Sequence, residues 1–159
     1  MSLLAPPSLA VDGSPFSLGI VAARYNPTLV DGLLARVRAG LVAAGVKGRN
    51  ITVVRVPGSH EVPWAAQLLA KRRGCHCVIG LGVLIAGSTN HHEMVGQSVS
   101  LALQQVALAT GTPIVNGVIV VDNLKQARAR CLGSLNRGAE FASAALAMAE
   151  LKRTHGGSA

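Results

Sequence analysis

Residues 75–110, CHCVIGLGVLIAGSTNHHEMVGQSVSLALQQVALAT, contain the pattern that decides the fold. The apolar run from Cys75 to Leu84 predicts a buried strand, and the segment from His92 to Thr110 has the length of a long helix. The polar turn AGSTNHHE, residues 86–93, separates the two. A buried strand followed by a polar turn and a long helix is typical of a parallel sheet whose strands are connected by helices.

The rest of the chain repeats this alternation. Further strands are expected at 16–23, 51–56 and 114–121, and further helices at 27–45, 61–71, 123–133 and 137–152. Strands connected in this way form a doubly wound sheet through right-handed crossovers. The sequence therefore predicts an α/β fold with three layers, α/β/α, in which helices flank a sheet of four parallel strands.

Length and composition favour a single domain. The 159 residues, half of them hydrophobic, suffice for one substantial core but not for two domains of ordinary size. Residues 1–15 carry three prolines without the basic start and apolar block of a signal peptide, so we expect a flexible N-terminal arm before a domain at 16–159. No apolar run is long enough to span a bilayer, and a cytoplasmic location is expected.

The chain carries a formal charge of +8, which raises the possibility of a nucleic-acid partner. However, the cluster at 71–73 and the pair at 152–153 fall near expected helix ends, where cations complement the helix dipole, and no aromatic residues interleave with them. We therefore expect no nucleic-acid partner and attribute part of the excess to a small anionic substrate. The mean hydropathy of +0.42 is high for a small monomer and favours self-association.

Three cysteines, at 75, 77 and 131, give no even disulfide framework and fit a reducing compartment. Cys75, His76 and Cys77 suggest a metal site at first sight. Alternation along a strand would place both thiols on one face and the imidazole on the other, which is poor ligand geometry. We expect structural cysteines and no metal.

Polar and aromatic residues concentrate in the turns after the four expected strands, which are 24–26, 57–61, 86–93 and 121–123. Doubly wound sheets bind ligands beyond the carboxyl ends of their strands, so chemistry is expected in these turns. Gly87, Ser88 and Thr89 precede the long helix, where backbone amides bind anions, and a phosphate would fit there. Gly82 to Thr89 resembles a nucleotide-binding P-loop, but Ser88 stands at the position of its essential lysine.

Each remaining candidate side chain has two interpretations. His91 could move protons near the phosphate, or His91 or His92 could merely cap the following helix. Tyr25 could stack on a flat heterocycle or pack at the rim of the core. Glu61 could accept hydrogen bonds from ligand hydroxyls or could complement the helix dipole.

Arg130 and Arg137 flank a glycine-containing loop near the C-terminus. Guanidinium groups there could clamp an oxyanion, although surface arginines usually face solvent.

Taken together and in order, these turns resemble the lumazine synthase family over about residues 16–152. The matching segments are RYN at 24–26, VPGSHEVP at 56–63, GVLIAGSTNH at 82–91, QA at 126–127 with Arg130, and NRG at 136–138. The resemblance implies a flavodoxin-like fold and a cofactor-independent transferase of riboflavin biosynthesis. That enzyme condenses 5-amino-6-ribitylaminouracil with 3,4-dihydroxy-2-butanone 4-phosphate to 6,7-dimethyl-8-ribityllumazine plus phosphate.

The resemblance also implies an assembly and a set of site residues. Family members form pentamers that share active sites across subunit interfaces, some build icosahedral shells from them, and riboflavin synthase is a candidate partner. The implied catalytic residues are His91 and Arg137, and the implied phosphate-binding residues are Gly87, Ser88, Thr89 and Arg130, the arginines coming from a neighbouring subunit. The implied substrate-binding residues are Tyr25, Asn26, Ser59, His60, Glu61, Val83, Leu84, Ile85 and, from a neighbouring subunit, Asn116.

Four positions depart from the family pattern. Ala86 replaces a usual Arg or Lys, His92 a usual aromatic residue and Arg137 a usual Lys, while Asn116 stands where many members have Phe. These departures keep open an alternative function, in which a catalytically impaired paralogue binds flavins or lumazines or forms a shell.

Overall fold

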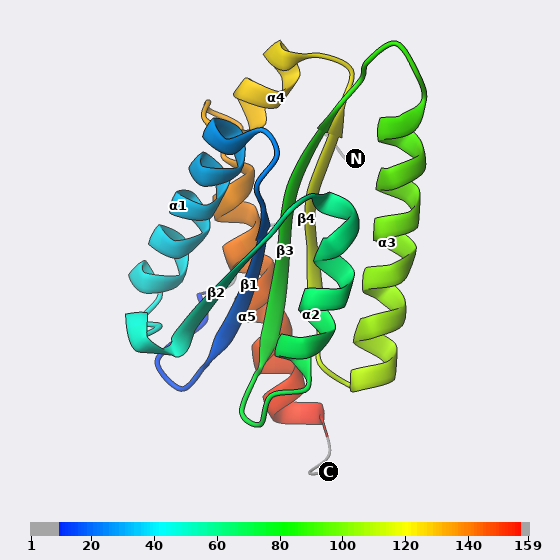
Figure 1. Cartoon of the computed structure of the whole chain (residues 1–159). Coiled ribbons are helices and arrows are strands. Elements are labelled where there is room, and N and C mark those ends of the chain that lie inside the picture. Colours follow the sequence, from blue (N-terminus) through cyan, green and yellow to red (C-terminus); the bar gives the residue numbers. More distant parts are fainter. Residues whose placement is uncertain (1–9, 157–159) are drawn as a thin grey trace.

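The computed structural model describes residues 10–156, and a parallel sheet of four strands forms its middle layer (Figure 1). The strands are β1 (Leu18–Ala23), β2 (Ile51–Val56), β3 (Cys77–Ile85) and β4 (Ile114–Val121). Their order in the sheet is β2-β1-β3-β4, so β2 and β4 are the edge strands. The predicted α/β fold with a doubly wound parallel sheet is confirmed.

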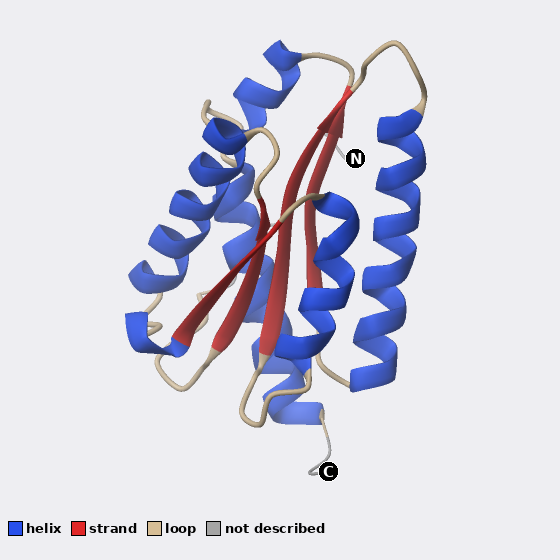
Figure 2. Ribbon diagram, in the orientation of Figure 1, coloured by secondary structure: helices blue, strands red, loops and turns tan. Residues whose placement is uncertain are grey.

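Helices cover both faces of the sheet (Figure 2). The helices α2 (Val62–Ala70) and α3 (His91–Thr110) cover one face, and α1 (Pro27–Ala43), α4 (Leu124–Cys131) and α5 (Arg137–His155) cover the other. Two short 3-10 turns, η1 (Gly48–Asn50) and η2 (Ser59–Glu61), lead into β2 and α2. Within residues 10–156, no helix combines the length and apolar character needed to cross a membrane.

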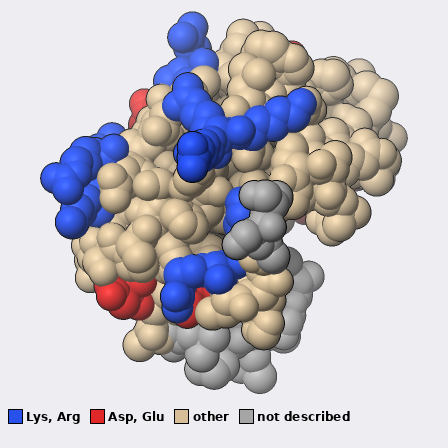
Figure 3. Space-filling model, turned by 90° about the horizontal axis from the view of Figure 1, so that it is seen from below, with Lys and Arg blue, Asp and Glu red and all other residues tan. Residues whose placement is uncertain are grey.

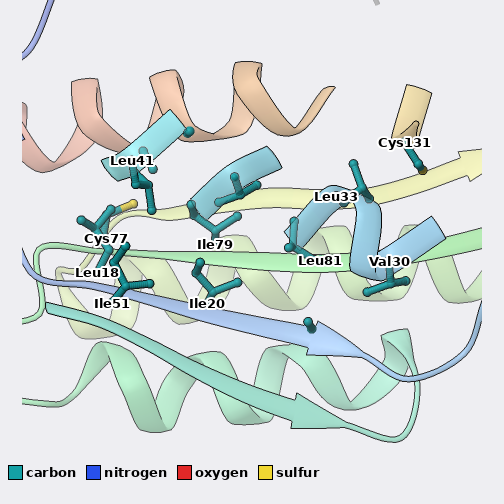
Figure 4. Packing of buried hydrophobic residues seen from close by; sticks show 14 of the residues in the cluster. Leu18, Ile20, Val30, Leu33, Leu41, Ile51, Cys77, Ile79, Leu81 and Cys131 are labelled. Carbon is teal, nitrogen blue, oxygen red and sulfur yellow. The ribbon is translucent and has the colours of Figure 1, made fainter. Parts of the chain in front are cut away.

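Alternation along the strands divides the core into two clusters. Leu18, Ile20 and Ala22 of β1 point towards α1 and α5, whereas Val21 and Ala23 point towards α2 and α3. Figure 4 shows the first cluster, in which side chains from β1, β2, β3, α1 and α4 meet. Because of this alternation, every buried strand residue has an apolar layer to pack against. This packing fixes the position in the sheet at which each strand ends and its turn begins.

The predicted bounds hold for β2 and β4, while β1 and β3 begin two residues later than predicted. Cys75 and His76 lie in the loop before β3, where the backbone N–H of Ser17 donates to His76 Nδ1 at 3.1 Å. The expectation that Cys75 and Cys77 share one face is wrong. Cys77 lies in the cluster beneath α1 and α5, and Cys75 packs against the α2 and α3 side, because the strand begins only at Cys77.

All three thiols lie in surroundings that oppose their ionisation. Burial raises the pKa of Cys77 to about 12 and that of Cys131 to about 11, and it also raises the pKa of Cys75. Because the thiolate is the reactive form, these cysteines are poor nucleophiles near neutral pH. The three side chains therefore act as packing residues.

Part of the predicted N-terminal arm contacts the body of the molecule. Val11 packs against the core, and Gly13 N–H donates to the carbonyl of Ala44 at 2.7 Å. Residues 1–9 and 157–159 lie outside the described residues.

Candidate active site

A pocket of about 610 Å³ lies beyond the carboxyl ends of β1, β2 and β3. It contains every predicted site residue except Asn116, Arg130 and Arg137. Its lining residues are Tyr25, Asn26, Gly58, Ser59, His60, Glu61, Val83, Leu84, Ile85, Gly87, Ser88, Thr89, His91, His92 and Val95. The fold thus brings three of the four predicted turns together.

Tyr25 and Asn26 form the wall of the pocket at the end of β1. Asn26 has a left-handed backbone (φ 52°), and its side-chain Nδ2 donates to the carbonyl oxygen of Val83 at 2.9 Å. The ring of Tyr25 is 73% exposed, so one of its faces is available to a flat ligand. A Cβ placed on Gly58 would lie 3.4 Å from Tyr25 Cδ2, so the ring lies close to the turn after β2.

The turn after β2 presents one carboxylate and one buried hydroxyl. Glu61 Oε2 accepts a hydrogen bond from the backbone N–H of Gly58 at 2.8 Å, which fixes the carboxylate and leaves Oε1 for another donor. Oε1 lies 3.9 Å from His60 Nδ1. Ser59 is buried against Gly82 of β3, where a Cβ would overlap Ser59 Oγ. Only glycine at position 82 therefore allows the turn to approach the sheet this closely.

The turn after β3 leads into the N-terminus of the 20-residue helix α3. Gly87, Ser88 and Thr89 are exposed, and nothing lies within 4 Å of a Cβ placed on Gly87. Asn90 precedes the helix without forming a side-chain cap, so the first amides of α3 lack that partner. Amides at a helix start, together with the positive end of the helix dipole, favour an anion.

Two histidines follow in the first turn of α3, and both line the pocket. His91 is exposed, whereas His92 is half-buried, and His92 Nδ1 is buried with no hydrogen-bond partner in the part of the chain that the structure describes. No Lys or Arg side chain is among the residues that line the pocket. Its cationic capacity within this chain therefore rests on His60, His91 and His92.

The basic side chains gather elsewhere. Figure 3 shows Lys and Arg side chains spread over the end of the molecule at which the strands begin. Arg49, Arg72 and Arg73 line a smaller pocket of about 180 Å³ at that end. Within one chain, the excess of Lys and Arg therefore lies outside the lining of the larger pocket.

Asn116, Arg130 and Arg137 lie outside the pocket. Asn116 is exposed on the edge strand β4, where its Oδ1 accepts from Val118 N–H at 3.0 Å. Arg130 donates to the carbonyl of Gln126 within α4 at 3.2 Å. Arg137 begins α5 and forms an ion pair with Glu140.

Gly58, His92 and Val95 also line the pocket but were not predicted as site residues. Gly58 belongs to the VPGSHEVP segment, and Val95 lies four residues after His91, so helical periodicity could have placed it on the same face. His92 carried no signal beyond its departure from the family pattern.

A doubly wound sheet with a pocket at its carboxyl edge, an exposed turn at the start of a long helix and a neighbouring imidazole is typical of an α/β enzyme that acts on a small molecule. The family model for 6,7-dimethyl-8-ribityllumazine synthase matches residues 15–153, and the chain belongs to this family.

Similar curated proteins carry the name 6,7-dimethyl-8-ribityllumazine synthase. The protein from Kineococcus radiotolerans is 47% identical over 143 residues, which cover 88% of this chain and 87% of the relative. The protein from Paracidovorax citrulli is 40% identical, covering 89% and 90%. The protein from Coxiella burnetii is 40% identical, covering 88% and 93%.

Proposed function

We propose that the pocket at the carboxyl edge of the sheet is the active site of this lumazine synthase, an enzyme of riboflavin biosynthesis. The observation that carries the proposal is that one pocket collects an exposed aromatic ring, a fixed carboxylate, an exposed turn at a helix start and an imidazole. These are Tyr25, Glu61, the turn at 87–89 and His91.

The proposed reaction joins 5-amino-6-ribitylaminouracil to 3,4-dihydroxy-2-butanone 4-phosphate. The amine attacks the ketone and loses water to give an imine, phosphate leaves, and the second amine closes the ring with loss of another water. The products are 6,7-dimethyl-8-ribityllumazine, phosphate and two waters. Holding two reactants in one geometry can contribute roughly 7 kcal/mol or more of the barrier reduction.

The pyrimidine and its ribityl chain occupy the half of the pocket between β1 and β2 in this proposal. Tyr25 offers a ring face to the heterocycle, with Asn26 beside it, and residues 83–85 border the edge of the ring. Ser59, His60 and the free Oε1 of Glu61 are available to the ribityl hydroxyls. The exposure of Tyr25 and the fixed position of Glu61 support this assignment.

The phosphorylated ketone occupies the other half. The amides of Gly87, Ser88 and Thr89 hold its phosphate at the start of α3. His91, two residues further on, carries protons between the amine, the ketone oxygen and the leaving phosphate. An imidazole suits this role because it gains and loses protons near neutral pH.

We further propose that the active site is completed by a second subunit. Asn116, Arg130 and Arg137 would then act in the pocket of a neighbouring subunit, with Arg130 at the phosphate, Arg137 beside His91 and Asn116 near the ring. A guanidinium from outside would supply the cation that the lining residues of this chain lack.

Exposed apolar side chains support self-association. Met94, Leu101 and Leu108 of α3 are 61%, 62% and 77% exposed and recur every seven residues, so they form one stripe along the helix. On α2, Trp64 and Leu68 are exposed one turn apart. Burying such a stripe against other copies would remove apolar surface from water.

The assembly and location follow from the same proposal. We propose a pentamer, either alone or assembled into icosahedral shells, with riboflavin synthase as a candidate partner. Residues 16–159 would act as one domain, preceded by the arm, in the cytoplasm. The three free cysteines fit a reducing compartment. A particle mass in solution at a multiple of five subunits is expected, and a monomer would contradict it.

Subunit mixing tests the shared site. His91→Ala and Arg130→Ala each inactivate the enzyme if the first acts within its own pocket and the second in its neighbour's. Co-assembly of the two variants would restore activity at about a quarter of the sites, because half of the pockets keep His91 and half of their neighbours keep Arg130. Mixed assemblies no more active than either variant would refute the shared site.

A further inference from the structure

His92 combines three observations that the proposed roles do not use. It lines the active-site pocket, it is half-buried, and its Nδ1 has no partner among the described residues.

The burial of Nδ1 decides which nitrogen of His92 carries the proton. A neutral imidazole has one N–H donor and one acceptor nitrogen. A buried N–H without an acceptor is costly, and the neutral tautomer with its proton on Nδ1 would place such a donor there. The ring is therefore most stable with its proton on Nε2. Nε2 is absent from the buried unpaired nitrogens, so it is the atom open to a ligand.

Few other polar side chains are placed to form a hydrogen bond with His92 Nε2. Within α3, its neighbours are His91 and Glu93, and the turn after β2 contributes His60 and Glu61. Tyr25 comes from the turn after β1. Within residues 10–156, none of these groups forms a hydrogen bond with His92.

We propose that His92 binds the substrate's phosphate through its Nε2–H, as a hydrogen-bond donor that this chain carries in addition to the amides of residues 87–89. The inference rests on the proposed phosphate site at the start of α3. It makes His92 a substrate-contacting residue, while proton transfer remains with His91.

Three substitutions separate this role from packing. In His92→Gln, the side-chain amide nitrogen reaches the position of Nε2–H. In His92→Asn, the shorter side chain places its amide nitrogen only at the position of Nδ1. His92→Phe keeps an aromatic ring but has no donor. His155, exposed at the end of α5, provides a matched control in His155→Gln. Melting temperatures check that every variant is folded.

Inorganic phosphate is the probe, with its dissociation constant measured by calorimetry on the assembled enzyme at one pH near 8. We expect His92→Phe and His92→Asn to bind phosphate roughly tenfold more weakly, the loss of one hydrogen bond to a charged group. His92→Gln should stay within about twofold of the wild type, as should His155→Gln. Equal affinity in all four variants would overturn the proposal.

Steady-state kinetics provide a second readout. His92→Phe should raise KM for the phosphorylated ketone and leave KM for the pyrimidine unchanged. His92→Gln should have a KM for the phosphorylated ketone close to that of the wild type. An increase in both KM values would assign His92 a structural role and overturn the inference. A wild-type enzyme that binds no phosphate would refute the proposed phosphate site, and the donor role of His92 with it. A wild-type enzyme that binds phosphate as tightly as His92→Phe does would refute only the role of His92.

Discussion

The side-chain amide of Asn26 donates a hydrogen bond to the main-chain carbonyl oxygen of Val83 at 2.9 Å, and this bond ties the turn after β1 to the last residues of β3. Asn26 reaches that carbonyl from a left-handed backbone conformation, φ 52°, immediately before α1. Both residues line the pocket. One contact therefore holds the wall that carries Tyr25 against the strand on which the substrate ring is proposed to lie.

Substitutions of Asn26 separate the hydrogen bond from the backbone conformation. Asn26→Gly keeps the left-handed backbone accessible and removes the bond, so the free energy of unfolding should fall by about 1 kcal/mol. Asn26→Ala removes the bond and adds roughly 1 kcal/mol of backbone strain. Urea denaturation of both variants checks the order, and an Ala variant as stable as the Gly variant would contradict the role of the backbone.

Gly82→Ala and Gly48→Ala provide a matched pair of variants that test the close approach of Ser59 to the sheet. A Cβ on Gly82 would overlap buried Ser59 Oγ, so Gly82→Ala should displace the turn after β2, destabilise the fold by about 1–3 kcal/mol and reduce kcat/KM at least tenfold. Nothing lies within 4 Å of a Cβ on Gly48, so Gly48→Ala should change stability by less than about 0.5 kcal/mol. Similar kinetics in the two variants would show that the approach of Ser59 to Gly82 is not required.

Much of this arrangement could be predicted from the sequence. The bounds of β2 and β4 follow from apolar runs that end in proline, glycine or polar residues. The pocket turns follow because parallel strands end at one edge of the sheet. The later start of β3 could not be predicted, because Cys75 and His76 lead directly into its apolar run. The bond from Ser17 N–H to His76 Nδ1 joins residues that are 59 positions apart in the sequence.

Some site features also depend on contacts that a linear pattern does not contain. The buried Nδ1 of His92 depends on packing at the start of α3. The overlap of a Cβ on Gly82 with Ser59 brings the turn after β2 against β3, although β1 lies between these two strands in the sheet. The family resemblance implies roles for Asn116, Arg130 and Arg137, but all three lie outside this chain's pocket.

Alkaline pH should destabilise the protein through its thiols. Below about pH 9, Cys77 is protonated in both the folded and the unfolded state and has no effect on the pH dependence. Between about 9 and 12 the unfolded thiol ionises while burial keeps the folded thiol neutral, so stability falls as pH rises. The slope reaches at most about 1.4 kcal/mol per pH unit for one group.

The variant Cys77→Ala tests whether the Cys77 thiol causes the loss of stability at alkaline pH. Its free energy of unfolding should decline less steeply between about pH 9 and 10.5 than that of the wild type, with Cys131 accounting for part of the remaining slope. Urea denaturation at several pH values provides the measurement. Parallel curves for the variant and the wild type would exclude Cys77 as the source.

The stripe on α3 predicts an assembly defect without a folding defect. Leu108 is 77% exposed in a single chain, so Leu108→Arg should barely change the stability of an isolated subunit, yet it should dissociate an oligomer that buries the stripe. Val42→Arg, at an exposed apolar position of α1, is the control. Sedimentation velocity compares the two, and an intact assembly of the Leu108 variant would remove α3 from the proposed interface.

His91 is expected to act in catalysis and not in assembly. His91→Ala should lower kcat by about 10² to 10⁴ if the imidazole moves protons in the rate-limiting step, while the particle mass stays unchanged. Lumazine fluorescence and light scattering measure the two quantities. A variant that dissociates would instead assign His91 a structural role.

A crystal structure with inorganic phosphate and a ribityl-bearing pyrimidine analogue tests the proposed active site most directly. We predict the heterocycle against Tyr25, a ribityl hydroxyl at Glu61, and phosphate at the amides of Gly87, Ser88 and Thr89 within reach of His91. Phosphate bound instead at the opposite end of the sheet, between Arg49, Arg72 and Arg73, with the larger pocket empty, would contradict the proposal.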